Sequence, residues 1–411
     1  MDSNELIYDW NAVGEFQIPR GRKVMLDDET LRDGLQNPSV HDPTIEEKIE
    51  ILHLMEELGM DSVNIGLPGA GPRAMADAEA LAREIVRAKM KIRPNCAART
   101  HENDIRPIAE ISQRVGIAIE AATFLGSSPI RRLVEDWTVE HLQRTTEKAV
   151  RFVVAQGLPA MYVTEDTIRT DPDTIRRLYT TAINCGARAV VLCDTVGHAT
   201  PTGAYNLVKF ALKEIVKPSG EKIRVDWHGH CDRGLAIANS LAAIAAGADQ
   251  VHAVANSLGE RVGNTPMELM LVNLRLLGLI DRDLSRLREY CEKVARATHT
   301  TIPPNYPVIG RDAFRTATGV HAAAIIKAYR KKDTMLANMV YSGVPSHLFG
   351  LDQVIEIGPM SGRSNVIYWL EKRGIPATEE LVSRIFDAAK KSTRVLTEEE
   401  VLALAGQASR P

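Results

Sequence analysis

Short apolar runs alternate with longer amphipathic segments along most of the chain. The run 187–193, Ala-Arg-Ala-Val-Val-Leu-Cys, is short and mostly apolar, which is typical of a buried strand in a parallel sheet. In the segment 44–59, apolar residues recur every three or four positions, as they do on one face of a helix. Thr44 and Glu47 mark where this helix begins, because each side chain can accept a hydrogen bond from a free backbone amide there.

The strand-then-helix unit repeats through the first two thirds of the chain. Strands are predicted over 23–31, 62–67, 92–99, 118–125, 160–164, 187–193, 222–227 and 250–255. Helices are predicted over 44–59, 72–88, 104–115, 139–156, 173–185, 201–215, 234–247 and 266–277. About eight such units predict an α/β protein with a (β/α)8 TIM barrel. The main alternative is a doubly wound sheet, but no Gly-x-Gly-x-x-Gly follows the first predicted strand, so its most specific dinucleotide signature is missing.

The pattern changes after residue 280. Residues 281–298 predict a charged amphipathic helix, and the proline-rich stretch 301–307 interrupts regular structure. The remainder predicts a small, mostly helical C-terminal region. The predicted domains are a lead-in over 1–22, a catalytic barrel over 23–280, a linker region over 281–332 and a C-terminal subdomain over 333–411.

Composition narrows the class of protein. The 411 residues are 45% hydrophobic and 25% charged, with a formal net charge of −3, which gives no electrostatic reason to expect a nucleic-acid partner. No uninterrupted apolar stretch has the length of a membrane span, and the acidic start of the chain does not resemble a secretion signal. Five scattered cysteines without Cys-x-x-Cys spacing argue against a disulfide scaffold, so we expect a cytoplasmic protein.

Candidate chemistry collects first at His228 and His230. They stand at the end of a predicted strand, and residues two apart on a strand point to the same side. Two imidazoles that face one point are half of a metal site, or a pair of hydrogen-bonded barrel histidines.

Other polar residues also follow predicted strands, at the end of the barrel where active sites of this fold lie. They include Arg32, Asp33 and Gln36, Asn64, Arg99, Thr164 to Arg169, Cys193 to Thr195, and Glu260 to Asn264. Together they add carboxylate and amide oxygens to the two imidazoles. Such a mixed set favours a divalent cation that stays open to substrate oxygens over a closed structural zinc.

Several motifs make a family resemblance specific. The segments 28–36 (DETLRDGLQ), 228–239 (HGHCDRGLAIAN) and 258–264 (LGERVGN) resemble the 2-isopropylmalate synthase/homocitrate synthase family, metal-dependent barrels related to 3-hydroxy-3-methylglutaryl-CoA lyase. The resemblance extends through 164–166, 193–197 and 318–321 to 361–363, and covers roughly residues 23 to 370.

The resemblance implies roles for ten residues. The implied metal ligands are Asp33, His228, His230 and, more loosely bound, Asn264. The implied catalytic residues are Arg32, Glu165 and His321, and the implied substrate contacts are Gln36, Arg99 and Thr195. The family also implies a divalent cation (Mg, Mn or Zn), acetyl-CoA as co-substrate, a 2-oxo acid as acceptor, and a homodimer in which His321 reaches the partner's active site.

These roles suit a Claisen condensation, which removes a proton from the methyl group of acetyl-CoA and stabilises an alkoxide on the oxo acid. A metal polarises the ketone, and a permanently charged arginine such as Arg32 stabilises the enolate. Glu165 and His321 are the candidates for proton transfer, and the sequence leaves open which of them is base and which is acid.

Two features depart from the family pattern. Asn64 stands where the family usually has a glutamate, and the chain ends at Pro411, without room for the long regulatory domain of leucine-inhibited members. Two alternative functions remain: a lyase that cleaves a C–C bond on the same scaffold, and a non-catalytic barrel.

Overall fold

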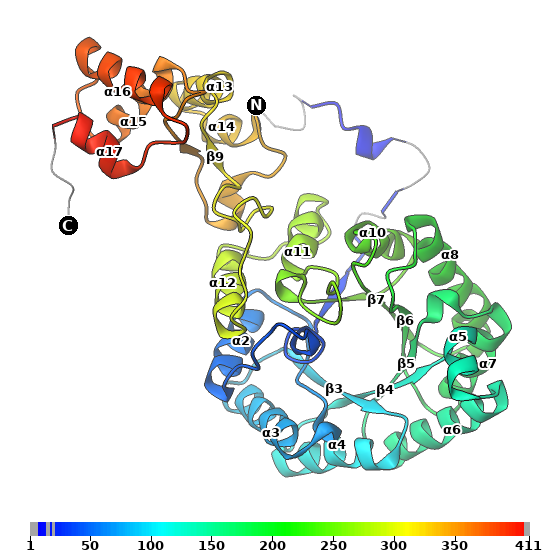
Figure 1. Cartoon of the computed structure of the whole chain (residues 1–411). Coiled ribbons are helices and arrows are strands. Elements are labelled where there is room, and N and C mark those ends of the chain that lie inside the picture. The colour runs from blue at the N-terminus through cyan, green and yellow to red at the C-terminus, as the bar shows by residue number, and fades with distance from the viewer. Residues whose placement is uncertain (1–6, 14–16, 19–20, 407–411) are drawn as a thin grey trace. The chain divides into compact units, whose positions relative to one another are not determined.

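The computed structural model describes residues 7–13, 17–18 and 21–406 (Figure 1). The predicted lead-in over 1–22 lies partly outside the described residues, and its described part contains a short 3-10 helix, η1 (Trp10–Ala12). The chain forms two compact units: Trp10–Arg282 with Glu289–Thr301, and Met1–Asp9 with Asp283–Arg288 and Ile302–Pro411. Each unit is described separately below.

The larger unit is a closed barrel of parallel strands, hydrogen-bonded in the order β1 to β8 with β8 returning to β1. Its strands are β1 (Met25–Asp28), β2 (Ser62–Asn64), β3 (Arg93–Arg99), β4 (Glu120–Gly126), β5 (Ala160–Glu165), β6 (Ala189–Asp194), β7 (Arg224–Gly229) and β8 (Gln250–Ala253). The predicted TIM barrel is confirmed, and the doubly wound alternative is wrong because the sheet closes on itself.

Helices surround the strands (Figure 1). They are α2 (Ile45–Glu57), α3 (Pro72–Arg87), α4 (Glu102–Val115), α5 (Pro129–Glu135), α6 (Val139–Ala155), α7 (Pro172–Asn184), α8 (Pro201–Ala211), α9 (Lys217–Ser219), α10 (Ala236–Ala246) and α11 (Met267–Leu276). The predicted start of α2 is confirmed, since Thr44 and Glu47 form a reciprocal capping box. The predicted helix over 201–215 is interrupted, because Leu212–Val216 forms a π-helical turn after α8.

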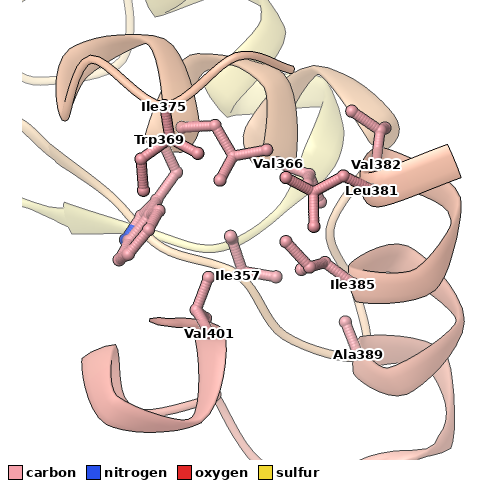
Figure 2. Packing of buried hydrophobic residues seen from close by; sticks show 10 residues of the cluster. Ile357, Val366, Trp369, Ile375, Leu381, Val382, Ile385, Ala389 and Val401 are labelled. Atoms are coloured by element: carbon pink, nitrogen blue, oxygen red, sulfur yellow. The ribbon is translucent and has the colours of Figure 1, made fainter. Parts of the chain in front are cut away.

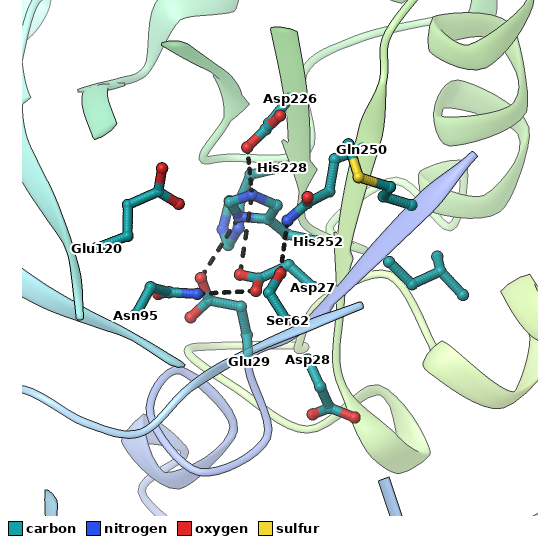
Figure 3. Close-up of polar contacts among 12 residues, drawn as sticks. Asp27, Asp28, Glu29, Ser62, Asn95, Glu120, Asp226, His228, Gln250 and His252 are labelled. Carbon is teal, nitrogen blue, oxygen red and sulfur yellow. Dashed lines mark hydrogen bonds and ion pairs between the residues drawn. The ribbon is translucent and has the colours of Figure 1, made fainter. Parts of the chain in front are cut away.

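One side of the barrel interior is charged. Alternation along β7 turns Asp226 and His228 to the same face, and these residues pair in register with Gln250 and His252 of β8. His252 pairs in turn with Asp27 of β1, and Figure 3 shows these polar side chains gathered between the strands. Strands β4 to β6 instead contribute an apolar cluster, made of Ala122, Met161, Ala189, Val191 and Cys193.

The smaller unit is mostly helical. Its elements are α13 (Gly319–Arg330), α14 (Thr334–Met339), α15 (Arg363–Lys372), α16 (Glu379–Lys391) and α17 (Glu398–Leu404), with a two-stranded parallel sheet of β9 (Arg315–Thr316) and β10 (Val354–Ile355). Figure 2 shows Trp369 and Val366 of α15 packed with Ile385 of α16 and Val401 of α17. Helix α12 (Leu287–Ala297) begins in this unit, and from Glu289 onward its residues belong to the barrel unit.

Within the part of the chain that the structure describes, no helix has the length and apolar character needed to span a bilayer.

Candidate metal and substrate site

Asp33, His228 and His230 converge at the carboxyl end of the barrel strands. Their potential ligand atoms all lie within 4.8 Å of one another. Asp33 Oδ2 is 3.4 Å from His228 Nε2 and 3.9 Å from His230 Nε2. All three side chains are buried, so the predicted strand-end convergence of the two histidines is present in the structure.

Asn264 lies beside this group. Its backbone bridges that of His230, and its side-chain amide donates a hydrogen bond to the carbonyl of Leu258 at 3.1 Å. Gly259, at φ +131°, lets the chain pass closely: a Cβ there would lie 2.1 Å from Asn264 Nδ2 and 3.4 Å from Asp33 Oδ1. The glycine of the predicted Leu-Gly-Glu-Arg motif is therefore required by close approach.

Two buried oxygen atoms at this group lack a partner. Asp33 Oδ1 and Asn264 Oδ1 accept no hydrogen bond among the described residues. Buried polar atoms are normally satisfied, and each exception needs an explanation such as a bound ion or water. Two imidazoles with carboxylate and amide oxygens are a donor set that fits a divalent cation.

The protonation states agree with ligation. Burial favours the neutral acid, but the Arg32 guanidinium outweighs it and lowers the pKa of Asp33. Burial also disfavours charged imidazoles, lowering the pKa of His228 to about 3 and that of His230 below its ordinary value. At neutral pH the group therefore offers an ionised carboxylate and neutral nitrogen lone pairs, which are the forms that bind metals.

A second group, Glu29 with His228 and His252, also has ligand atoms within 4.8 Å of one another. Burial opposes the charge of His252, but Asp27, Asp226 and Glu29 outweigh it and raise its pKa to about 10. A protonated imidazole has no free lone pair. The first group is therefore the better candidate for a metal.

One cavity of about 200 Å³ joins this group to other predicted site residues. Its lining includes Arg32, Asp33, Gln36, Glu165, Thr195, His228 and His230. Leu67, Ala97, Ala122, Phe124, Met161, Val163 and Val191 form much of the rest of its wall. Glu260 and Arg261 also line the cavity, which thus combines polar residues with one apolar wall.

Arg32 lies next to the metal group. Its Nη1 is 3.2 Å from Asp33 Oδ2, and its Nε donates to Glu29 Oε2 at 2.8 Å. Although burial disfavours a cation, the carboxylates of Glu29 and Asp33 raise the pKa of Arg32. Arg32 therefore stays charged while only 18% of its side chain is exposed.

Glu165 and Thr195 occupy the ends of β5 and β6. Burial raises the pKa of Glu165, with Arg131 and Arg32 acting in the opposite direction. The pKa of this carboxyl is therefore higher than that of an exposed glutamate. The hydroxyl oxygen of Thr195 accepts a hydrogen bond from the Asp166 amide at 2.8 Å. That bond leaves the Thr195 proton free to be donated into the cavity.

Arg99 is not part of this group, and His321 belongs to the other compact unit. The Arg99 guanidinium binds Asp104, with Nε 2.6 Å from Oδ2, and Arg99 is not among the described residues that line the cavity. His321 belongs to the smaller unit, where it is exposed and its ring stacks on that of Tyr341 at 4.1 Å. Their predicted roles stay predictions.

Sequence reasoning missed the charged residues beneath the site: Asp27, Glu29, Asp226 and His252. A signal was present, since Asp226 stands two residues before His228 in a predicted strand and so shares its face. Their ion pairs join β1, β7 and β8 across the interior, and such pairs depend on the closed barrel.

The chain is similar in sequence to known proteins. A model of the HMGL-like family matches residues 23–294. The chain is 32% identical over 381 residues to homocitrate synthase AksA of Methanopyrus kandleri, covering 92% of this chain and 89% of that protein. It is also 32% identical to 2-isopropylmalate synthase of Pyrococcus abyssi, covering 90% of this chain and 74% of that protein.

Solved structures share the fold. An HMG-CoA lyase of Bacillus subtilis superposes with a TM-score of 0.59 at 20% identity, covering 69% of this chain and 97% of the lyase. At that identity the likeness concerns the barrel alone.

Proposed function

The chain belongs to the HMGL-like family and, within it, to the group of 2-isopropylmalate and homocitrate synthases, and on this premise we propose that it condenses acetyl-CoA with a 2-oxo acid. The products are a 2-alkylmalate-type acid and CoA. The observation that carries the proposal is the sharing of one cavity by the Asp33–His228–His230 group, Arg32 and Glu165.

The residues at the cavity have separate roles in metal binding, substrate binding and charge stabilisation. Asp33, His228, His230 and Asn264 would hold a divalent cation, which when bound polarises the ketone of the oxo acid as a Lewis acid. Thr195 donates a hydrogen bond to the carboxylate of the oxo acid, and Gln36 contacts the same substrate. Arg32 stabilises the negative charge that develops on the thioester oxygen, because its own charge is fixed and partly shielded from water.

Glu165 is the proton-transfer group within the barrel. Its raised pKa makes it a stronger base than an ordinary exposed carboxylate, and general bases act best when their pKa approaches the working pH. His321 is its counterpart, supplied by the partner chain of a homodimer. Its exposed ring is available to a second chain.

The cavity also favours one class of oxo acid. Its wall away from the metal group is built from apolar side chains such as Leu67, Phe124 and Met161, and it encloses about 200 Å³. Drug-sized ligands usually occupy about 300–1,000 Å³, so this space fits a small acid and the reactive end of the thioester. We therefore propose an oxo acid with a short apolar side chain that packs on this wall, because a second carboxylate placed against it would be desolvated. A second carboxylate directed instead at Arg261, which also lines the cavity, is the alternative that the substrate panel below tests.

The test is CoA thiol release from acetyl-CoA with a panel of 2-oxo acids and a divalent metal. The panel contains 2-oxoisovalerate, pyruvate, oxaloacetate, 2-oxoglutarate and phosphonate or phosphinate analogues. We expect the highest kcat/KM with a small apolar acid. Cleavage of a 3-hydroxyacyl-CoA without condensation on any oxo acid would replace the synthase by a lyase, and neither activity in a metal-loaded protein would leave a non-catalytic barrel.

A further inference from the structure

The geometry points to Glu29 and His252 as positioning residues that hold the Arg32 guanidinium at the cavity from below. Its catalytic consequence rests on the proposed function, whereas the ion-pair arrangement itself can be tested without any substrate. Neither residue belongs to the preferred metal group or to the residues implied by the family resemblance.

Glu29 is the link between the site and the barrel interior. One of its carboxylate oxygens, Oε2, accepts from Arg32 Nε at 2.8 Å, while the other, Oε1, lies 3.4 Å from His252 Nδ1. The Glu29 backbone carbonyl also accepts the amides of Arg32 at 3.1 Å and Gly34 at 3.0 Å. Glu29 thus fixes both the side chain of Arg32 and the turn that carries it.

His252 is held in turn by carboxylates deeper in the barrel. Its Nε2 lies 3.4 Å from Asp226 Oδ2 and 3.9 Å from Asp27 Oδ2, as Figure 3 shows. Asp226 accepts from Arg224 Nε at 2.9 Å, and Arg224 Nη2 donates to Glu120 at 2.8 Å. Close polar contacts therefore run from Arg32 through Glu29, His252, Asp226 and Arg224 to Glu120.

This arrangement is costly for a barrel core. The interiors of such barrels are usually filled by branched aliphatic residues, and buried ion pairs often stabilise a fold no better than apolar residues of similar volume. Glu29, His252 and Asp226 are all less than 5% exposed. A role in fixing the charge at the cavity accounts for their presence, because an electrostatic catalyst works only when it is held in place before the reaction.

Asn64, at the end of β2, cannot serve as a carboxylate partner of Arg32. It lines the same cavity as Arg32, but it is neutral, and its amide Nδ2 lacks a hydrogen-bond partner among residues 21–406. Position 64, where the resembling synthases usually carry a glutamate, therefore offers no negative charge to Arg32. Glu29, directly after β1, supplies a carboxylate to Arg32 instead.

The experiment combines kinetics with chemical modification in the metal-loaded, full-length protein. Glu29→Gln should lower kcat for CoA release about 100-fold with little change in the KM for the oxo acid, since small misplacements of a catalytic group can cost that much. His252→Gln should lower kcat about 10-fold. The double variant should be no slower than Glu29→Gln, because His252 acts through Glu29.

Phenylglyoxal modification of Arg32, followed by peptide mass spectrometry, gives a readout independent of turnover. It should be at least about 5-fold faster in both single variants than in the unaltered protein, because Arg32 loses its carboxylate partner in Glu29→Gln and the anchor of that partner in His252→Gln. In Glu29→Asp, which keeps the charge on a shorter side chain, the rate of Arg32 modification should lie between those of the unaltered protein and Glu29→Gln. This variant replaces Glu29→Gln if Glu29→Gln does not fold.

Glu84→Gln is the matched control. Glu84 is a buried carboxylate paired with His53 and Arg87 on the outer helices, so its loss removes a buried ion pair without touching the site. Unchanged Arg32 reactivity in Glu29→Gln, additive effects of the two substitutions on kcat, or equal effects in Glu84→Gln would overturn the inference. If the unaltered protein condenses no oxo acid, the proposed function fails, and the modification rates still decide whether Glu29 and His252 hold Arg32.

Discussion

The Nε2 atoms of His228 and His230 lie 3.3 Å apart at the end of β7. Two ligands that each sit about 2.1 Å from one cation, at angles between octahedral and tetrahedral, are separated by roughly 3.0–3.4 Å. Burial keeps both imidazoles neutral by lowering each pKa. Two neutral nitrogens at this separation, with the Asp33 carboxylate beside them, are suitably placed to bind one divalent cation.

The first prediction concerns that ion. Replacing His228 by alanine should remove metal and turnover together, because one nitrogen ligand of a three-ligand core is lost. Metal content is measured by mass spectrometry after dialysis, and CoA release by thiol titration. Chelation of the unaltered protein should abolish turnover, and Mg, Mn or Zn should restore it.

The control for this prediction is His53→Ala, which removes a histidine paired with Glu84 on the outer helices. It should retain both metal and activity. Full activity of the unaltered protein after exhaustive chelation would rule out a required metal.

A second prediction tests the close packing around Asn264. Gly259→Ala should weaken metal binding at least about 10-fold, since the new Cβ would lie 2.1 Å from Asn264 Nδ2 and displace the amide from the group. Gly278→Ala is the matched control, because that glycine also has a positive φ but its Cβ would meet no atom within 4 Å. Equal metal affinity of the two variants would remove Asn264 from the site.

The barrel could be predicted because its units are local. Each strand–helix unit shows in the spacing of apolar residues, and the capping box of Thr44 and Glu47 fixed the start of α2 to the residue. Helix α5 was missed since it has only seven residues, none of them buried, so no apolar face marks it. The strands β9 and β10 have two residues each, too few to show a period.

The site could be predicted only in part. The strand period brought His228 and His230 together, and Asp33 and Asn264 were found among the polar residues that follow predicted strands. Their assignment as metal ligands came from the family motifs. The ion pairs of Glu29 and His252 were missed because they join β1 to β8, which are more than 200 positions apart in the chain and become neighbours only when the barrel closes. Arg99 was expected at the substrate, but its guanidinium lies against Asp104.

The third prediction separates catalysis from binding. Arg32→Gln and Glu165→Gln should each lower kcat about 100-fold or more while changing the KM for the oxo acid little, because both groups act on charge and protons that move in the transition state. Steady-state CoA release gives both constants. Arg151→Gln removes only an exposed helix pair with Glu147 and should behave as the unaltered protein; unchanged kcat in both site variants would contradict the assigned roles.

The fourth prediction uses the raised pKa of His252. Its folded-state pKa of about 10 lies above the ordinary value of 6.5, so the protonated form stabilises the fold fully below pH 6.5. That stabilisation is lost as the pH rises through about 10. The difference in unfolding free energy between the unaltered protein and His252→Gln should therefore shrink by about 3–4 kcal/mol from pH 6.5 to pH 9.5.

Urea unfolding at the two pH values measures this difference. Asp27, whose pKa burial raises to about 6 against the opposing charge of His252, would titrate within this range once His252 is replaced. Both proteins are therefore compared in an Asp27→Asn background. Asp28 also titrates near pH 7, but both proteins contain it, so its effect cancels. A difference that does not change with pH would mean that His252 is neutral in the folded protein.

The last prediction concerns His321 and the homodimer. If His321 completes the active site of the partner chain, His321→Ala and Glu165→Ala proteins should each be inactive alone, yet a mixture that exchanges subunits should regain activity. In a hybrid dimer, one site combines an intact Glu165 with the intact His321 of the other chain, whereas the second site lacks both. Random exchange of equal amounts makes about half of the dimers hybrids with one working site each, so about a quarter of the unaltered activity should return. Exchange is verified with differently tagged chains and native mass spectrometry.

The control mixes Glu165→Ala with Arg32→Ala: both residues lie in the barrel unit, so the hybrid has no intact barrel and should stay inactive. Exchange without regained activity in the first mixture would place His321 in its own chain's site or outside catalysis.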